Sequence, residues 1–296
     1  MANQLRILHA LNVHNEEDII GYNLDWYRSQ GIDSIVVDNA STDGTKGILS
    51  SHLGSGVVTI KDVHTDHFDR SRLFGALTDL IHAHSPDWVV FSDADEFLQP
   101  FFEQDGTLKG LIEQADSGGY NLIQFHNMEF WMTPVDNPSN PNPIERIRQY
   151  SYFDSNRYKV FKFHPGFSLV PHRGHAPSFP EGVITRVLPE KGIMRHYKFR
   201  SLSQAYYKIH RIVPEPDRRD FGFHYAKFSE SPHWFIIPQS KLTLYNNDGQ
   251  WSMERKFDGN RMNRQEMLAY LGLQTDAELN DWFDLRKGVK DANLPT

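Results

Sequence analysis

The first hundred residues alternate short apolar runs with longer amphipathic segments, and this alternation constrains the fold more than any other feature. The segment 70–84, for example, places Leu73 and Leu77 on one helical face. Short runs rich in β-branched and aromatic residues lie between such segments, at 7–13, 35–38, 57–60 and 88–92. Strands that alternate with helices are typical of βαβ units. We therefore predict an α/β fold, with a mixed, mainly parallel sheet flanked by helices.

Turn and capping residues predict where the helices of this first half begin and end. Asn15 precedes an acidic first turn, so we expect it to cap a helix that Gly31 closes. The turn 39–44 follows the second strand and leads into a short helix that ends near Leu53.

The remainder of the chain is less regular. We expect helices at 108–115, 202–212, 263–270 and 276–287, strands at 121–126, 158–163 and 183–188, and a proline- and asparagine-rich loop at 133–143. We expect Met267, Leu271, Leu279 and Trp282 to pack the last two helices. The sequence thus predicts a single large domain with a C-terminal helical extension. Its expected parts are a first half at 1–100, a second half of the same domain at 101–235 and the extension at 236–296.

Composition excludes several classes of protein. The formal charge of −7 and the pI near 6.1 give no general attraction to nucleic acid or to an anionic membrane. The chain has no cysteine, which excludes disulfide scaffolds and thiolate zinc sites. It shows neither a signal-peptide pattern nor an apolar run long enough to span a membrane, so we expect a cytoplasmic protein with no nucleic-acid partner.

Polar residues follow three of the apolar runs. In an open parallel sheet, ligands bind beyond the carboxyl ends of the strands, so these residues are candidates for a binding site. The set comprises Asn12, His14 and Asn15 after the first strand, Asp38 and Asn39 after the second, and Asp93, Asp95 and Glu96 after the fourth.

The tripeptide Asp93-Ala94-Asp95 is the candidate metal anchor. With 24 aspartates in the chain, about two Asp-x-Asp pairs arise by chance, so the tripeptide alone is weak support. Its position after the buried run 88–91 matters more, because two carboxylates at such an exit repel each other unless water or a cation lies between them. Mn²⁺ or Mg²⁺, with phosphate oxygens as further ligands, fits this arrangement, and a solvated acidic turn is the alternative.

Other candidates leave two interpretations open. Asp38 either binds a base or ribose or closes an ordinary Asx turn. Arg70 and Arg72 either contact a nucleotide or lie on a solvated helix face. His196 lies among Arg195, Lys198 and Arg200. Its imidazole could complete a metal shell while these bases offset diphosphate charge. His172 and His175 have the spacing of a metal pair, but they more plausibly line a cleft or shape a loop.

Three motifs resemble, in order and spacing, the family 2-like glycosyltransferases. They are Asn15-Glu16-Glu17-Asp18-Ile19, Val37-Asp38-Asn39-Ala40-Ser41-Thr42-Asp43-Gly44-Thr45, and Asp87 through Phe97 with its Asp-Ala-Asp-Glu-Phe core. The last form is most similar to the branch related to family 92. The resemblance implies a GT-A fold, a nucleotide-sugar donor, commonly UDP-linked, and a divalent cation under the diphosphate. It also implies a glycan or related acceptor, such as a glycolipid.

The resemblance also implies roles for individual residues. The expected nucleotide contacts are Asn12, His14, Asp38 and Arg72, and Asn15, Glu16, Ala94 and Lys198 are expected on the same donor side. Asp93 and Asp95 are implied to hold Mn²⁺ or Mg²⁺, with His196 as a further ligand to the metal or the phosphate.

Inverting transfer requires a carboxylate that deprotonates the acceptor hydroxyl. The candidates are Glu129, which lies beside aromatic residues suited to a sugar ring, then Glu181, then Asp154. We therefore predict a metal-dependent glycosyltransferase, and the family 2 resemblance implies that it inverts the anomeric centre. The alternatives are a nucleotidyltransferase acting on a sugar phosphate and a nucleoside triphosphate, and a non-catalytic carbohydrate-binding protein. The first strand lacks a following Gly-rich phosphate loop with lysine, which disfavours nucleotidyl transfer.

Overall fold

The computed structural model describes most of the chain and divides it into two compact units. Unit 1 contains residues 1–128, 153–196 and 247–251, and unit 2 contains the rest. The described residues are 4–65, 69–101, 106–133, 135–137, 139–170, 176–201, 203–205, 207–208, 237–246, 248–256 and 264–287.

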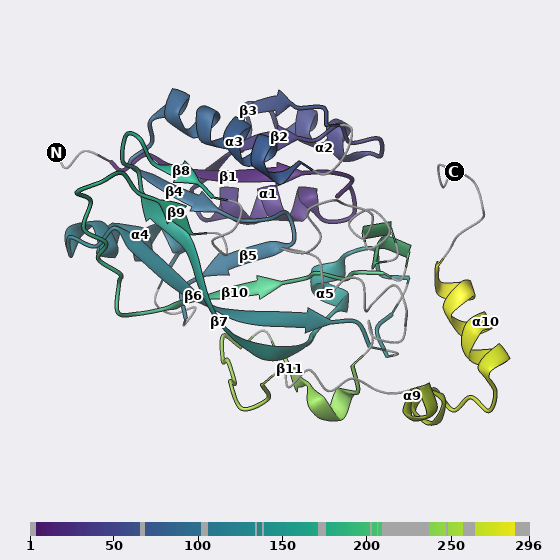
Figure 1. Cartoon of the computed structure of the whole chain (residues 1–296). Helices are drawn as coiled ribbons and strands as arrows, with labels where there is room; N and C mark the ends of the chain where they lie inside the picture. Colours follow the sequence, from purple (N-terminus) through teal and green to yellow (C-terminus); the bar gives the residue numbers. More distant parts are fainter. Residues whose placement is uncertain are drawn as a thin grey trace. The chain divides into compact units, whose positions relative to one another are not determined.

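A twisted sheet forms the centre of unit 1 (Figure 1). Its strands follow the order β3-β2-β1-β4-β7-β6-β10-β5. The first four run parallel: β1 (Ile7–Val13), β2 (Asp33–Asp38), β3 (Val57–Asp62) and β4 (Trp88–Phe91). The fold class predicted from the sequence, a mainly parallel sheet flanked by helices, is confirmed.

Helices cover both faces of this parallel part. They are α1 (Ile20–Ser29), α2 (Thr45–His52), α3 (Arg70–His84) and α4 (Leu108–Ser117). Trp88 and Val90 of β4 pack in a cluster with residues of α1 and α4, whereas Val89 and Phe91 pack in a second cluster with residues of α3. Successive side chains of a strand point to opposite faces, so a strand covered on both sides must be apolar throughout.

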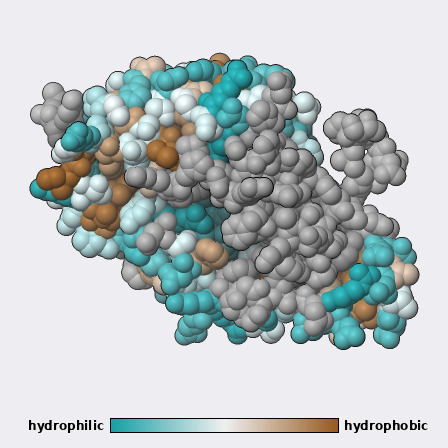
Figure 2. Space-filling model, viewed as in Figure 1, coloured by the Kyte–Doolittle hydropathy of each residue, from teal (hydrophilic) through white to brown (hydrophobic). Residues whose placement is uncertain are grey.

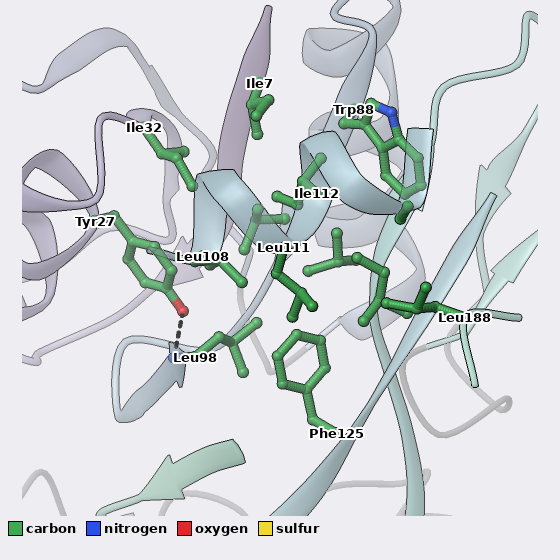
Figure 3. Close-up of a cluster of buried hydrophobic side chains, with 14 of the residues drawn as sticks. Ile7, Tyr27, Ile32, Trp88, Leu98, Leu108, Leu111, Ile112, Phe125 and Leu188 are labelled. Atoms are coloured by element: carbon green, nitrogen blue, oxygen red, sulfur yellow. Dashed lines mark hydrogen bonds between the residues drawn. The ribbon is translucent and has the colours of Figure 1, made fainter. Parts of the chain in front are cut away.

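The cluster between the sheet and α1 and α4 also joins β5 and β6 to the parallel strands. Figure 3 shows Tyr27 of α1 beside Leu98, Leu108 and Leu111, with Phe125 below them. The Tyr27 hydroxyl accepts a hydrogen bond from the backbone N–H of Leu98 at 3.3 Å. A helix that follows the first strand is thus fixed to the strand that follows the acidic turn.

The other strands of unit 1 run antiparallel to their neighbours where pairing is described. They are β5 (Glu96–Gln99), β6 (Leu122–Trp131), β7 (Gln149–Lys162) and β10 (Gly192–His196), and a two-stranded sheet of β8 (Ser168–Leu169) and β9 (Pro177–Ser178) lies apart. Four of these strands, β5, β8, β9 and β10, were not predicted. β4 pairs with β7, and β5 pairs with β10. The predicted strand 183–188 is wrong, because only a single bridge links Val187 to Leu122 and Ile184 is 72% exposed. Its β-branched residues have strand propensity, but the segment pairs with β6 only at this bridge, so no continuous ladder forms.

Gly192 begins β10 at a point where there is no room for a side chain. A Cβ there would lie 2.6 Å from the Gln99 carbonyl oxygen and 2.4 Å from the Phe125 ring. We expect Gly192→Ala to lower the free energy of unfolding by about 2 kcal/mol, because overpacking displaces the backbone. Urea denaturation tests this against Gly47→Ala in α2, where a Cβ meets nothing within 4 Å. Equal stability of the two variants would contradict the close packing at Gly192.

Unit 2 contains the outer part of β6, the first part of β7, and the C-terminal helices. β11 (Thr243–Leu244) pairs with β7, and the rings of Phe130 and Tyr197 stack with centroids 4.5 Å apart. Other elements are α5 (Pro143–Arg146), a 3₁₀ turn at Gln239–Lys241, α9 (Arg264–Leu271) and α10 (Asp276–Lys287). The two predicted C-terminal helices are confirmed, and Met267 and Leu279 are buried as expected. Residues 203–205 and 207–208 are helical, and the remainder of the predicted helix 202–212 lies outside the described residues.

The exposed surface of the described residues is mainly polar. On the face shown in Figure 2, most coloured residues are teal or white, and the brown ones gather in small groups. Among the described helices, none combines the length and the apolar character that a membrane crossing requires.

Candidate functional site

The carboxyl ends of the parallel strands meet at one edge of the sheet in unit 1. The strand register places Val13 beside Asp38, and Asp38 beside Asp62. On the other side of β1, Ala10 pairs with Phe91, directly before the segment that carries Asp93 and Asp95. The polar residues expected at a common edge therefore lie at a common edge, which is where open parallel sheets bind ligands.

The loops that follow β1 and β2 are joined by reciprocal hydrogen bonds. The Asn15 side chain accepts from the Thr42 N–H at 2.7 Å and donates to the Thr42 hydroxyl at 3.2 Å. The Glu16 N–H donates to the Thr45 hydroxyl at 2.8 Å. Asn15 is in the left-handed region, with a φ of 51°. The prediction that Asn15 caps the following helix is wrong, because its side chain binds the second loop and α1 begins only at Ile20.

Asp38 is fully buried at the end of β2 and closes the predicted Asx turn. Its carboxylate accepts from the Ser41 N–H at 3.2 Å and from the Ser41 hydroxyl at 2.5 Å. The Lys46 ammonium lies 3.4 Å from the same carboxylate and 2.9 Å from that of Asp62. Asp38 therefore holds the turn after β2 in place. A carboxylate has about four acceptor positions, so it can still accept a hydrogen bond from a ligand in addition to these contacts.

Asn12 and His14 flank the end of β1. The His14 ring contacts the Asn39 carbonyl oxygen through Nδ1 at 2.5 Å. The amide nitrogen and oxygen of Asn12 are both buried and have no hydrogen-bond partner within the described structure. Buried polar groups are nearly always hydrogen-bonded, so the position of this amide at the end of β1 makes it a candidate contact for a ligand at this edge.

Arg72 lies at the start of α3, where Asp69 caps the helix by accepting from the Arg72 N–H at 2.9 Å. The Arg72 side chain is exposed and lines an open pocket with Lys61, His64 and Gly75. Its charge is thus available to a ligand at the edge where β3 ends.

Asp93, Ala94 and Asp95 form a tight turn between β4 and β5. Asp95 is 2% exposed, Ala94 is buried and Asp93 is half-buried. The Glu96 N–H donates to the Asp93 carbonyl at 3.1 Å, which closes the turn. A nearly buried carboxylate beside a half-exposed one differs from the solvated acidic turn that was the alternative.

His196 reaches this turn through the antiparallel pairing of β5 with β10, which aligns His196 with Glu96. Its Nε2 atom lies 3.6 Å from Asp95 Oδ1. Neighbouring ligands of an octahedral Mg²⁺ or Mn²⁺ at about 2.1 Å lie roughly 3 Å apart. The two atoms are thus close to the spacing of two ligands of one cation. Carboxylate oxygen suits Mg²⁺ and Mn²⁺, whereas imidazole is a ligand typical of transition metals, so the histidine favours Mn²⁺ over Mg²⁺.

A divalent cation at this turn would need ligands from outside the protein. Within the ranges that the structure describes, no three His, Asp or Glu side chains converge as a complete cation site. Mg²⁺ is commonly bound by one or two carboxylates and completed by water and phosphate oxygens, so a two- or three-residue anchor fits the group. The expectation about His172 and His175 concerns residues outside the described ranges.

A buried polar network, which was not predicted, includes Ser92, the residue directly before the acidic turn. His9 lies in the middle of β1, fully buried and stacked on Tyr27 with a centroid separation of 3.7 Å. Its ring nitrogens contact the Ser34 hydroxyl at 3.0 Å and the Ser92 hydroxyl at 2.8 Å. A histidine inside an otherwise apolar strand was the signal in the sequence for such a network.

Burial of this imidazole predicts a pH dependence of stability. Desolvation lowers the pKa of His9 from 6.5 to about 3, so the folded protein keeps the ring neutral. As the pH falls below about 6.5, the unfolded chain binds a proton at His9 that the folded chain does not. The stabilising contribution is therefore present above pH 6.5 and lost as the pH falls towards 3, with an expected cost of about 2 kcal/mol between pH 6.5 and 4.5.

Urea denaturation of wild type and of His9→Gln across this pH range isolates the contribution. Glutamine can contact both serines, and the carboxylates titrate in both proteins. We expect the difference in free energy of unfolding between the two proteins to shrink as the pH falls. A difference that stays constant from pH 7 to pH 4.5 would show that His9 is not the titrating group.

The three candidates for the catalytic base lie in different settings. Glu129 is 8% exposed and belongs to the part of β6 in unit 2. Glu181 is exposed in the turn after β9, and Asp154 is exposed on β7. Lys198 follows β10 in unit 2, with its ammonium 5.3 Å from the centre of the Phe199 ring. Within unit 1, the structure thus places His196 with the acidic turn.

The solved structures to which the chain is similar share little sequence with it. TarS from S. aureus in complex with UDP is 15% identical over 53% of this chain and 47% of that chain, with a TM-score of 0.33. A Bacillus anthracis protein assigned as a glucose-1-phosphate thymidylyltransferase, in complex with sucrose, is 10% identical over 97% and 96% of the two chains, with a TM-score of 0.30. The chain spans about half the length of the TarS structure. These similarities are too low to establish a shared activity.

No curated protein matches the chain significantly. The family model for glycosyl transferase family 2 matches residues 11–175. The matched range begins within β1 and includes β4 and the acidic turn, and it covers more than half of the chain. The chain therefore belongs to glycosyl transferase family 2.

Proposed function

We propose that this protein transfers a sugar from a nucleotide-sugar donor, UDP-linked, to a hydroxyl group of a glycan or glycolipid acceptor. The observation that carries the proposal is the approach of His196 Nε2 to Asp95 Oδ1 at 3.6 Å, directly beyond the buried strand β4. Family membership supports the reaction class, and the resemblance to the branch related to family 92 supports a cation-dependent form.

The donor binds along the edge where β1, β2 and β4 end. The unsatisfied amide of Asn12 supplies one donor and one acceptor to the nucleoside. Asp38 and His14 shape the same edge, and the exposed Arg72 offers charge to the phosphates. Asn15 and Glu16 act indirectly, because they hold the loops after β1 and β2 together.

Asp95 and His196 would hold Mn²⁺ or Mg²⁺ as a pair. The half-exposed Asp93 of the same turn would join them only when a cation binds, because no three such side chains converge among the described residues. A cation there neutralises negative charge on the diphosphate. The protein is acidic overall, so local positive charge at this edge is what makes binding of a diphosphate favourable.

A carboxylate in the acceptor-binding part removes the proton of the attacking hydroxyl. That oxygen bonds to the anomeric carbon as the bond to the diphosphate oxygen breaks and the nucleoside diphosphate leaves, which inverts the anomeric centre. Glu129 is the first candidate because it is nearly buried in β6, where water is largely excluded. Glu181 is the second candidate, because it is exposed and would act only with the acceptor bound.

Thermal denaturation with and without ligands tests the proposal. A ligand present at a hundred times its Kd raises the free energy of unfolding by about 2.7 kcal/mol, so a measurable rise in Tm is expected. We expect UDP and UDP-sugars to raise Tm in the presence of Mn²⁺ or Mg²⁺ and much less in their absence. Nucleoside triphosphates alone should give no larger effect.

Other outcomes would assign a different function. Stabilisation by a nucleoside triphosphate with a sugar phosphate, together with release of pyrophosphate, would identify a nucleotidyltransferase. Stabilisation by oligosaccharides only would identify a carbohydrate-binding protein. If no nucleotide changes Tm at any metal concentration, the transferase proposal is wrong.

A further inference from the structure

A fully buried ion pair lies directly behind the acidic turn. The Lys159 ammonium, on β7, lies 2.5 Å from Glu96 Oε2, and the side chains of Lys159 and Glu96 are 0% and 3% exposed. Charged side chains are almost never buried to this extent without a specific partner. We infer that Lys159 and Glu96 are positioning residues that hold the acidic turn in its cation-binding form, an inference that rests on the proposed function.

The geometry of Glu96 couples the ion pair to the backbone of the turn. Its Oε2 atom also accepts a hydrogen bond from the Asp93 N–H at 2.9 Å. One carboxylate oxygen therefore binds both the lysine and the first residue of Asp93-Ala94-Asp95. Because the Asp93 N–H is fixed, the orientation of the peptide units that carry both aspartates is restricted.

The backbone of Glu96 is held from the opposite side by α1. The Asn23 amide and the Tyr27 hydroxyl each donate to the Glu96 carbonyl oxygen at 3.1 Å. The main chain of Glu96 is thus anchored to a helix while its side chain reaches back to Asp93. This arrangement makes Glu96 a rigid support for the turn.

The ion pair also adjusts the charge around the turn. Asp93, Asp95 and Glu96 place three carboxylates within four residues. Lys159 neutralises Glu96, and its ammonium also lies 5.6 Å from the centre of the Phe91 ring. Glu96 is thereby kept from acting as a third metal ligand, and two aspartates remain to face a cation.

Two charge-neutral double variants separate the hydrogen bond from the charge. In the first, Lys159→Met with Glu96→Gln (the Met/Gln variant), residue 96 keeps an oxygen that can accept from the Asp93 N–H. In the second, Lys159→Met with Glu96→Met (the Met/Met variant), that acceptor is absent while the side-chain volume at residue 96 is similar. Both remove the buried charges together, so neither leaves an unpaired ion in the core.

Mn²⁺ binding is measured by electron paramagnetic resonance of the free ion with UDP present at saturation, because the cation needs ligands from outside the protein. The exchange of the Asp93 N–H is followed by hydrogen–deuterium exchange. Loss of a group that supports metal ligands typically weakens metal binding by about 10- to 100-fold. We expect the Met/Met variant to show at least about a 10-fold higher Kd for Mn²⁺ and faster exchange at Asp93, whereas the Met/Gln variant stays within about 3-fold of wild type. In activity assays, the apparent KM for Mn²⁺ should rise more than kcat falls.

The outcomes distinguish this inference from the proposed function. If wild type binds Mn²⁺ and both variants bind it equally well, the proposed function stands and the positioning role is wrong. If the Met/Gln variant loses Mn²⁺ binding as the Met/Met variant does, the hydrogen bond is not the determinant and the inference is also wrong. If wild type itself does not bind Mn²⁺, the metal role in the proposed function fails, and the inference fails with it.

If the Met/Met variant does not fold, Mn²⁺ affinity and Asp93 exchange in the Met/Gln variant still decide the matter, because a change in either contradicts the role assigned to the acceptor.

Discussion

Asp95→Asn is expected to lower sugar transfer by about 10³-fold while the protein remains folded. Asparagine has nearly the same shape as aspartate and removes only the negative charge. Asp95 is 2% exposed and its Oδ1 lies 3.6 Å from His196 Nε2, so the charge is both desolvated and close to the second candidate ligand. Removing one preorganised electrostatic group from an active site typically costs about 10²- to 10³-fold in kcat, and a metal anchor lies at the upper end of this range.

The measurement is the initial rate of donor consumption at saturating Mn²⁺, with urea denaturation to confirm folding. Glu113→Gln is the matched control, because it removes one carboxylate charge from the exposed face of α4. We expect the control to keep wild-type activity. Transfer by Asp95→Asn at more than a tenth of the wild-type rate would show that Asp95 does not anchor a catalytic cation.

Lys159→Met is expected to produce the largest loss of stability. Breaking a buried ion pair by removing one partner typically costs about 3–5 kcal/mol, because the other charge stays buried without compensation. Here the remaining carboxylate is Glu96, which is 3% exposed and held by the backbone of the acidic turn. Adding Glu96→Gln removes that charge, so the double variant should recover most of the loss.

Lys162→Met on the same strand is the control for this prediction. Lys162 pairs with Asp116 at 2.6 Å, but its side chain is 40% exposed and that of Asp116 is 25% exposed. Pairs that solvent reaches contribute at most about 1 kcal/mol, so we expect a small effect. If urea denaturation gives equal losses for the two lysine variants, or if Glu96→Gln brings no recovery, the pair at Lys159 is not electrostatically essential.

Local sequence determined the parallel half of unit 1. The predicted strand 7–13 and the predicted helix 70–84 coincide with β1 and α3, residue by residue. These elements have a continuous apolar run or a regular helical stripe, and burial on one or both faces requires such a pattern. The order of the strands then follows from the parallel connections, which explains why Asp38 and the acidic turn were correctly expected at one edge.

Polar side chains at loop ends were less predictable. Asn15 precedes an acidic segment and therefore suits a helix cap, but its amide binds Thr42, 27 residues away. A capping residue has several partners of similar energy, and which of them lies within reach depends on the path of another loop. The first turn of α1 accordingly begins later than the sequence indicated.

Only the tertiary structure determines which residues contact the acidic turn. The sequence identified Asp93 and Asp95 through their position after a buried strand. It identified His196 as a candidate metal or phosphate ligand from the neighbouring bases and from the family resemblance, without a signal that brings it to Asp95. What brings His196 to Asp95 is the pairing of the short strands β5 and β10, and neither strand has enough length or alternation to be recognised locally. Lys159 likewise looks like the polar residue of an alternating strand, and its burial against Glu96 depends on a contact between residues 63 apart. Sequence pattern records which residues must be buried or exposed, but the partner of a buried charge is fixed only when distant strands come into register.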